Sequence, residues 1–379
     1  MTEPEPLQQT DRTYVRFRRR KLSYFSGADY FRLASHPRVM AAMQAGATKY
    51  GLNVAASRLT TGNHALYLAL EAQLAGFFAA ESALLVPSGY MTNLVVAQAL
   101  AGHFSHALID EGSHPSLSDA VRFLDCPVLQ FKSRNPEALA RAVHRCGPGS
   151  KLMVLTDGMF AHDGSAAPLA EHLEVLPKDA LILVDDAHGA GVLGRTGQGT
   201  LEHAGVSRRR IIQTITLSKA FGAYGGAILG PAQLRQRILD RSPMFIGSTP
   251  LPLPLANAAL EGVRVLKADK SLRRRLFANA AYVKAALREG GLPLAETPGP
   301  IVSLLPRSAS EAARLHRALL AAGIYPPFIK YPSGPLNGYF RFAISSEHSR
   351  RQLDSLIQVL LFGTLRQASN PLARLGPLG

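Results

Sequence analysis

Two aspartates and a histidine follow an apolar run in the segment LILVDDAHGAG, residues 181–191. Such a run is typical of a buried β-strand, so these polar residues would lie at its carboxyl end. Asp185 is the first acid after the run, and His188 comes three residues later. An acidic pair at a strand end also binds Mg²⁺ in nucleotide hydrolases, but those enzymes need a GxxxxGKS or GxxxxGKT loop, which this sequence lacks. We therefore expect no metal here, and a carboxylate that faces an organic ligand.

A lysine follows a second β-like run in ITLSKAFGAYGGAIL, residues 215–229. The apolar flanks indicate that the segment lies against the core, with Lys219 pointing into a cleft. A desolvated amine is a nucleophile, and its usual role is a Schiff base with a carbonyl cofactor, above all pyridoxal 5′-phosphate (PLP). PLP also needs a carboxylate against its pyridine nitrogen, because the protonated ring is the electron sink for a carbanion. Asp185 suits that role, and His188 could reach the phenolic oxygen of the cofactor.

Other residues suit the remaining parts of this cofactor. In VPSGYMTN a strand, a Ser-Gly turn and a helix follow one another, and the start of a helix offers unpaired amides to a phosphate. His114, in DEGSHPS, follows a strand end and could lie flat on the pyridine ring. The residues expected on the phosphate side are Ser88, Gly89, Tyr90, Thr216, Ser248 and Thr249.

A sheet must hold these residues together. Between about residues 50 and 250, short β-like runs alternate with helical stretches, and the runs are ALLVPSGY, HALIDEGSH, LMVLTDGMF, LILVDDAHG, IIQTITLSK and GGAILG. This alternation indicates an α/β domain with a mainly parallel sheet, in which ligands bind at the carboxyl ends of strands. The proline-rich TPLPLPLANAAL indicates a boundary. We expect an N-terminal segment over residues 1–45, a large PLP-binding domain over 46–250 and a small C-terminal domain over 251–379.

The chain of 379 residues carries a formal net charge of +15, with basic clusters at 16–21, 208–210 and 273–275. This charge suits a phosphate-bearing substrate or an acidic carrier protein, and it leaves a nucleic-acid-binding protein open as an alternative. Two cysteines without a CxxC pair favour a reducing compartment. The sequence has no signal-peptide pattern and no run long enough to span a bilayer, so we expect a cytoplasmic protein.

Taken in order from about residue 24 to 362, these motifs resemble the α-oxoamine synthase family of PLP-dependent acyltransferases. The matching blocks include ASRLTTGNHALYLALEAQLAGF, SGYMTN, VDDAHGAGVLGRTGQG, TLSKAFGAYGG and FRFAIS. The resemblance implies fold type I: a large domain with a mainly parallel, seven-stranded type of sheet and a smaller α+β domain. It also implies a homodimer with shared active sites. Members such as 8-amino-7-oxononanoate synthase and serine palmitoyltransferase condense an amino acid with an acyl thioester.

The resemblance also assigns catalytic roles to single residues. Lys219 matches the Schiff-base lysine and Asp185 the partner of the pyridinium nitrogen. His114 matches the histidine that stacks on the ring, and His188 the one that contacts the phenolate. Arg341, in YFRFAIS, matches the arginine that holds the substrate carboxylate, a role suited to a bidentate guanidinium.

Two further matches concern the partner subunit and the substrate. Ser248 and Thr249 match a segment that reaches the phosphate bound by the neighbouring subunit. Ser57 replaces a threonine that, in glycine-restricted 5-aminolaevulinate synthases, crowds the substrate α-carbon. The chain departs from the family pattern around the acyl and amino-acid pockets, at Ser113, Asp157 (for Glu), Ala161 (for Ser) and His162 (for Met).

We therefore expect a homodimeric PLP enzyme that resembles 8-amino-7-oxononanoate synthase. It would condense a small α-amino acid, with L-alanine favoured over serine or glycine, with an acyl-CoA or acyl-carrier-protein thioester. An aminotransferase or aldolase of the same fold is the nearest alternative, disfavoured by the stacking histidine and the Asp-x-x-His pair. A basic nucleic-acid-binding protein with an idle PLP site is the alternative of another class.

Overall fold

The computed structural model describes residues 5–330 and 335–365. Contacts group them into two compact units. The larger unit comprises residues 33–271 and 297–299, and the smaller one the described residues of 1–32, 272–296 and 300–379. The division into domains at residues 45 and 250 stays a prediction, and the contacts place residues 33–45 and 251–271 with the larger unit.

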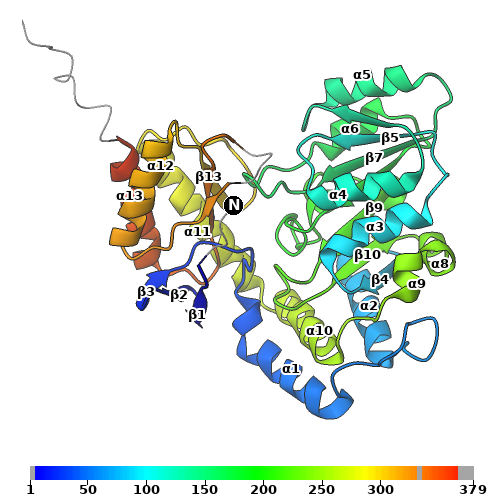
Figure 1. Ribbon diagram of the computed structural model, residues 1–379, viewed down its shortest axis with the longest axis horizontal. Helices are drawn as coiled ribbons and strands as arrows, with labels where there is room; N and C mark the ends of the chain where they lie inside the picture. The colour runs from blue at the N-terminus through cyan, green and yellow to red at the C-terminus, as the bar shows by residue number, and fades with distance from the viewer. Residues whose placement is uncertain (1–4, 331–334, 366–379) are drawn as a thin grey trace, which may run out of the picture. The chain divides into compact units, whose positions relative to one another are not determined.

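A seven-stranded sheet forms the centre of the larger unit (Figure 1). Its strand order is β4-β10-β9-β8-β7-β5-β6. The strands are β4 (Ser82–Val86), β5 (His106–Asp110), β6 (Val128–Phe131), β7 (Leu152–Asp157), β8 (Leu181–Asp185), β9 (Ile211–Thr216) and β10 (Gly226–Gly230). β10 runs antiparallel to β4 and β9, and the other pairs are parallel. The expected mainly parallel sheet is confirmed, whereas β6, a short and partly exposed strand, was not predicted.

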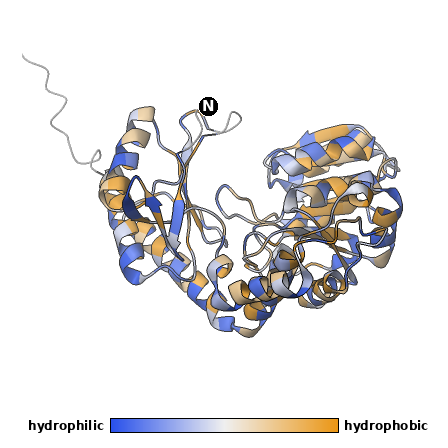
Figure 2. Ribbon diagram, turned by 60° about the horizontal axis from the view of Figure 1, so that its bottom comes forward, coloured by the Kyte–Doolittle hydropathy of each residue, from blue (hydrophilic) through white to orange (hydrophobic). Residues whose placement is uncertain are grey.

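Helices cover both faces of this sheet, which explains why most of its strands are largely apolar rather than alternating. In β8, Leu183 packs in a core with side chains of α3 (Gly89–Ala99), α4 (Pro115–Ala120) and α8 (Ala232–Arg241). Ile182 and Val184 point the other way, into a core with α5 (Pro136–Cys146) and α6 (Leu169–Val175). The strands accordingly appear orange in Figure 2. The polar residues of the buried strands lie mostly at their ends, with Gln213 and Thr214 within β9 as exceptions.

Helix α10 (Leu253–Ala268) explains why the larger unit extends past residue 250. It packs along α1 (Pro37–Tyr50) and α2 (Ala65–Phe78). Asn257 Nδ2 donates to the carbonyl of Ala42 at 2.7 Å, and Gly46 lets the two helices approach, because a Cβ there would lie 2.9 Å from Asn257 Cβ. Pro254 of the proline-rich stretch falls in the first turn of α10, where a missing N–H is tolerated.

The smaller unit is an α+β structure, as expected. Its C-terminal part has an antiparallel sheet ordered β11-β13-β12, made of β11 (Ile301–Leu304), β13 (Tyr339–Ala343) and β12 (Phe328–Ile329). The helices α11 (Lys270–Glu289), α12 (Ala309–Ala321) and α13 (Arg350–Leu365) accompany it, and their apolar faces share one core with Phe340 and Phe342. A second sheet, not predicted, joins β1 (Gln8–Asp11), β2 (Tyr14–Phe17) and β3 (Arg20–Ser23).

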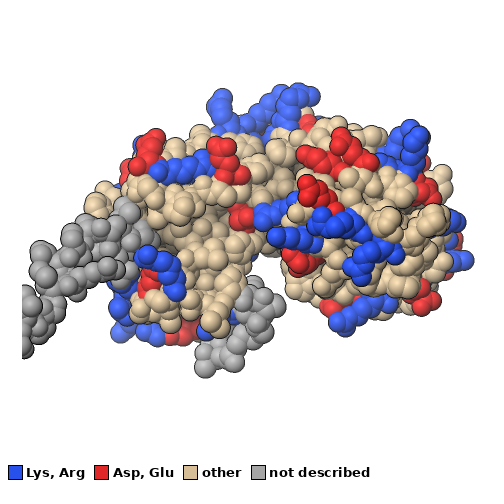
Figure 3. Space-filling view, turned by 90° about the horizontal axis from the view of Figure 1, so that it is seen from above, with Lys and Arg blue, Asp and Glu red and all other residues tan. Residues whose placement is uncertain are grey.

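The basic clusters of the sequence differ in what they do. Arg208 donates to the carbonyl of Phe78 at 2.9 Å, and Arg210 donates to the carbonyls of Pro177 and Leu173 at 2.8 and 2.9 Å. These two arginines serve the fold, whereas the cluster at 16–21 is mostly exposed. On the face in Figure 3, acidic side chains are interspersed with the basic ones.

Within the described ranges, the structure has no helix that combines the length and the apolar character needed to cross a membrane.

Candidate active site

A cavity of about 250 Å³ opens at the carboxyl ends of the central strands of the larger unit. Most of the residues singled out in the sequence line it. They are Ser88, Gly89, Tyr90, His114, Asp185, His188, Thr216 and Lys219, joined by Ser116, Asp157, Met159, Ala187 and Ser218. The convergence of strand ends thus brings together residues that are more than 100 positions apart in the chain.

Asp185 ends β8 and is 7% exposed. Its Oδ2 accepts hydrogen bonds from Asn93 Nδ2 at 2.7 Å and from Ser116 Oγ at 3.2 Å, and its Oδ1 accepts one from the backbone N–H of Ala187 at 3.1 Å. All three donors are neutral. They stabilise the ionised carboxylate without cancelling its charge, so Asp185 can pair with a cationic ring nitrogen.

Asn93 and Ser116 are site residues that the sequence reasoning missed. Asn93 is fully buried on α3, and its Oδ1 accepts a hydrogen bond from Thr214 Oγ1 at 2.7 Å, which fixes which way the amide faces. A signal was available, because Asn93 stands one helical turn after Gly89 in SGYMTN and Ser116 two residues after His114.

The second acid of the DDAH segment turns away from the cavity. Asp186 is buried and accepts hydrogen bonds from Thr200 N at 2.8 Å, Thr200 Oγ1 at 2.6 Å and Gln213 Nε2 at 2.6 Å. Burial raises its pKa to about 6, and these hydrogen bonds oppose the rise. Gly199 has φ 89°, and a Cβ there would lie 1.9 Å from Asp186 Oδ2. Asp186 is therefore a structural residue, and Asp185 is the acid that faces the cavity.

Lys219 lies in a tight loop between β9 and β10. Hydrogen bonds between Leu217 N and Gly225 O and between Ala223 N and Leu217 O, both 2.9 Å, close the loop. Gly222, with φ 63°, permits close packing, because a Cβ there would lie 2.3 Å from the carbonyl carbon of Leu33. Leu217 and Phe221 are fully buried, so the loop is anchored while the half-buried Lys219 reaches the cavity.

His114 caps the N-terminus of α4 and borders the cavity. Its Nδ1 accepts from the backbone N–H of Ser116 at 3.2 Å, so the proton of the neutral ring is on Nε2. Its own backbone N–H donates to Asp157 Oδ1 at 3.1 Å. Burial and the charge of Lys219 lower the pKa of His114, and Asp185 opposes them. The ring is thus neutral near pH 7 and is held by backbone contacts on both sides.

The start of α3 also borders the cavity. Ser88 caps this helix by accepting from Met91 N at 3.4 Å, and Gly89 begins it. A Cβ on Gly89 would lie 2.7 Å from Thr216 Cβ, so only glycine lets the helix start and β9 approach this closely. The bare amides of the first turn and the Thr216 hydroxyl suit a phosphate.

Three expected residues lie elsewhere in the larger unit. Ser248 follows α9 (Pro243–Gly247) and donates to the carbonyl of Met244, and Thr249 beside it is exposed. The carbonyl of Ser57 accepts from Thr60 N at 3.1 Å and Gly62 N at 3.0 Å in the loop before α2. None of these three borders the cavity. In the smaller unit, Arg341 lies on β13 opposite Ser303 of β11.

Asp157 also faces the cavity, at the end of β7. Ala161 and His162, in the loop that follows, do not border it. Burial and the charge of Asp185 raise the pKa of Asp157 well above its ordinary value, against the pull of Lys219 and of the hydrogen bond from His114. This aspartate differs from Asp185 in having few donors around it.

PLP fits these residues part by part. The glycine at 89 leaves room at the helix start for a phosphate, the Asp185 carboxylate would face the ring nitrogen, and Lys219 would supply the amine. When bound, PLP supplies an electron sink for negative charge on the substrate α-carbon. The protein holds the acid and the base groups around the point where it would lie.

Comparisons with known proteins agree. The sequence profile of the family described as aminotransferase class I and II matches residues 25–360. The chain is 36% identical over 344 residues to 8-amino-7-oxononanoate synthase of Thioalkalivibrio sulfidiphilus, covering 90% of this chain and 88% of that one. It is 32% identical over 342 residues to 8-amino-7-oxononanoate synthase 1 of Bacillus subtilis, covering 90% and 87%.

Among solved structures, the fold is similar to a serine palmitoyltransferase of S. paucimobilis that contains bound PLP and myriocin. The TM-score is 0.89 at 25% identity, and the match covers 96% of this chain and 93% of that one. The cofactor expected from the sequence is thereby confirmed as PLP. With its fold, its cavity and these relatives taken together, the chain belongs to the aminotransferase class I and II family and, within it, to the PLP-dependent α-oxoamine synthases.

Proposed function

We propose that this enzyme condenses L-alanine with an acyl-CoA or acyl-carrier-protein thioester, as an 8-amino-7-oxononanoate synthase does. The observation that carries this proposal is the similarity to 8-amino-7-oxononanoate synthases, which extends over 90% of the chain. The deprotonated α-carbon of the amino acid attacks the thioester carbonyl, the thiol leaves, and loss of CO₂ gives an α-amino ketone. Serine and glycine are the next candidate donors.

The residues singled out in the sequence have proposed tasks in this reaction. Lys219 carries the cofactor, and Lys219 or His114 removes the α-proton of the substrate. Asp185 holds the ring nitrogen in its protonated form, and His188 holds the phenolic oxygen. Arg341 binds the substrate carboxylate. The phosphate is held by Ser88, Gly89, Tyr90 and Thr216.

A homodimer with shared sites is part of the proposal. Ser248 and Thr249 do not border the cavity of their own chain, which agrees with a role toward the phosphate of a second copy. The test mixes two inactive variants, one with Lys219→Ala and the other with both Ser248→Ala and Thr249→Ala. Mixed dimers should then regain PLP binding and activity, because one of their two sites combines all three natural residues. If the mixture shows no more PLP binding or activity than the two variants measured separately, the sites are not shared.

The choice of amino acid is proposed to depend on Ser57. Serine lacks the methyl of threonine, so the pocket should admit one more carbon on the substrate, a preference worth roughly 1–3 kcal/mol or about ten- to two-hundredfold. Ser57→Thr should shift the preference from alanine toward glycine and leave PLP binding unchanged. An unchanged ranking of the two amino acids would remove Ser57 from the proposal.

The direct test measures thiol release. Purified holoenzyme is mixed with a panel of acyl-CoA and acyl-carrier-protein thioesters and with alanine, serine or glycine. We expect thiol release that depends on both substrates and is greatest with alanine. Formation of a keto acid without a thioester would instead indicate an aminotransferase. Borohydride treatment should fix PLP on the peptide that contains Lys219, and a label on another lysine would refute the assignment.

A further inference from the structure

Two aspartates face the same cavity from neighbouring strands. In the parallel pairing of β7 with β8, Asp157 lies directly opposite Asp185, so both side chains project from the same side of the sheet. Both line the cavity, and they are 5% and 7% exposed. Like charges held this close in a buried site do not both ionise at ordinary pH.

The hydrogen bonds decide which aspartate keeps the charge. Asp185 accepts from Asn93, Ser116 and the N–H of Ala187, at 2.7, 3.2 and 3.1 Å. Among the described residues, the donor to the Asp157 carboxylate is the backbone N–H of His114, at 3.1 Å. Because an ionised carboxylate is stabilised by each donor it accepts from, Asp185 is the better anion.

The charges around Asp157 favour the same outcome. Asp185 on β8 and Asp110 on β5 face it with negative charge, and Lys219 faces it with positive charge. Burial and the two acids outweigh Lys219 and the His114 hydrogen bond, so the pKa of Asp157 lies well above its ordinary value. Asp157 therefore holds a proton more tightly than an ordinary aspartic acid does.

We propose that Asp157 is a positioning residue held as a neutral carboxylic acid: it fixes His114 at the cavity and adds no second negative charge beside Asp185. The proposal rests on the proposed roles of Asp185 and His114. A neutral carboxyl still accepts the His114 N–H through its carbonyl oxygen, and this contact sets where α4 begins. One net negative charge then remains to match one protonated ring nitrogen.

The aspartate is also a departure from the glutamate that the resemblance leads one to expect at this position. The side chain is shorter by one methylene, which keeps the carboxyl group near the β7 backbone and hence near Asp185. Asparagine has the shape of a neutral aspartic acid and offers an acceptor and a donor, but never a charge. Asp157→Asn therefore imitates the proposed state, and Asp157→Leu removes the acceptor altogether.

Infrared spectroscopy of the apoprotein tests the neutral state. At pH 8, about two pH units above the pKa of about 6 for Asp186, we expect a C=O stretching band of a protonated carboxylic acid. The band should be absent from Asp157→Asn and present in the control Asp186→Asn. If wild type and Asp157→Asn have the same spectrum in this region, Asp157 is ionised and the proposal is wrong.

Titration of the apoprotein with PLP tests the positioning role. Asp157→Asn should keep the wild-type dissociation constant within about threefold, and Asp157→Leu should raise it about tenfold or more, since a partly buried N–H loses its acceptor. A tenfold loss in Asp157→Asn would show that the charge is needed. Wild-type affinity in Asp157→Leu would show that the contact to His114 does not matter. Neither readout involves the amino acid or the thioester, so failure here is distinct from failure of the proposed reaction.

Discussion

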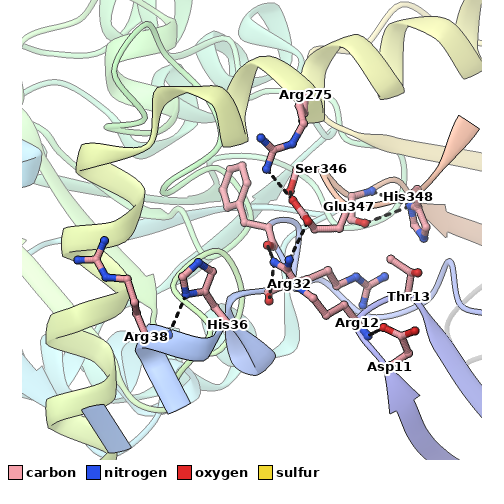
Figure 4. Close-up of polar contacts among 12 residues, drawn as sticks. Asp11, Arg12, Thr13, Arg32, His36, Arg38, Arg275, Ser346, Glu347 and His348 are labelled. Atoms are coloured by element: carbon pink, nitrogen blue, oxygen red, sulfur yellow. Dashed lines mark hydrogen bonds and ion pairs between the residues drawn. The ribbon is translucent and has the colours of Figure 1, made fainter. Parts of the chain in front are cut away.

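Two sites, an ion-pair cluster in the smaller unit and the cavity of the larger unit, surround their carboxylates in different ways. In the smaller unit, Glu347 accepts from Arg12 Nη1 and Arg275 Nη2, each at 2.8 Å, so a carboxylate lies between two cations (Figure 4). In the cavity of the larger unit, the described residues that donate to Asp185 are neutral groups. The first arrangement cancels charge, whereas the second preserves it for a ligand.

The pKa values follow the same division. Burial on its own would raise the pKa of Glu347, but the hydrogen bond from Arg275 and the charge of Arg12 lower it overall. For Asp157 in the cavity, burial and a like charge raise the pKa. Glu347, a half-buried carboxylate paired with two cations, thus serves the scaffold, whereas Asp157 faces a cavity and has a raised pKa, which makes it a candidate for chemistry.

The largest effect should come from the preserved charge. Asp185→Asn should still bind PLP but lose activity on the order of a thousandfold, because the ring nitrogen is no longer held protonated and the electron sink is weakened. Thiol release by the holoenzyme measures this. Asp186→Asn is the matched control, and we expect a much smaller loss of activity. If Asp186→Asn is the more damaging change, the assignment of the two acids is reversed.

Much of this arrangement could be predicted from the sequence. Asp185, His114 and Lys219 each follow an apolar run, and the carboxyl ends of parallel strands meet at one edge of a sheet. Residue type and local pattern were therefore enough to bring them together. Their roles on the cofactor stay predictions.

The contacts between distant segments could not be predicted in the same way. Arg12 and Glu347 are 335 positions apart, and neither belongs to a periodic pattern that would indicate a partner. The donors to Asp185 were missed for a related reason: Asn93 lies 92 positions away, and its amide is recognised as a site group only when the sheet is assembled. Sequence patterns specify the elements, whereas such pairs depend on the packing of those elements.

The second prediction concerns pH and contrasts His348 with Asp157. His348 is 4% exposed, stacks on Phe25 at 4.1 Å and accepts from Ser345 N at 3.0 Å. Burial, and then the charge of Arg32, lower its pKa to about 3, against the hydrogen bond with the Tyr24 carbonyl. Between about pH 6.5 and 3 the unfolded chain binds a proton that the folded one does not, so stability is complete above pH 6.5 and falls on acidification.

Urea denaturation of the apoprotein at a series of pH values measures this. The His348 contribution should fall by about 1.4 kcal/mol per pH unit below pH 6.5, and the fall should be absent in His348→Gln. Asp157 acts in the opposite sense, because its raised pKa makes the folded state the better proton binder, so its contribution falls as pH rises above about 4. If His348→Gln has the same acid slope as wild type, the histidine is not held neutral.

The third prediction breaks the paired charges. Glu347→Ala leaves Arg12 and Arg275 without their shared carboxylate, and Arg12 also donates to the carbonyls of Phe31 and Arg32 at 3.4 Å. We expect a loss of about 2 kcal/mol in the free energy of unfolding.

The matched control for Glu347 is Asp354→Ala, which removes an exposed pair with Arg350 one helical turn away and a hydrogen bond from the Tyr282 hydroxyl at 2.6 Å. Its cost should stay below about 1 kcal/mol, as for other exposed ion pairs. Equal losses in the two variants would mean that the ion pairs of Glu347 contribute no more to the free energy of unfolding than an exposed ion pair does.

The smallest effect distinguishes the two histidines by their access to solvent. His114 borders the cavity and is exposed, whereas His348 is enclosed and its Nε2 contacts the Tyr24 carbonyl at 3.0 Å. Diethyl pyrocarbonate attacks neutral, accessible imidazole. In the apoprotein it should therefore modify His114 and leave His348 unmodified. PLP that covers the ring face should slow the reaction at His114 by several-fold and change nothing at His348.

Peptide mapping by mass spectrometry, with and without PLP, follows both sites in one sample. Equal protection of both histidines would indicate that PLP tightens the whole chain rather than covering one residue, and no protection at His114 would remove it from the face of the cofactor.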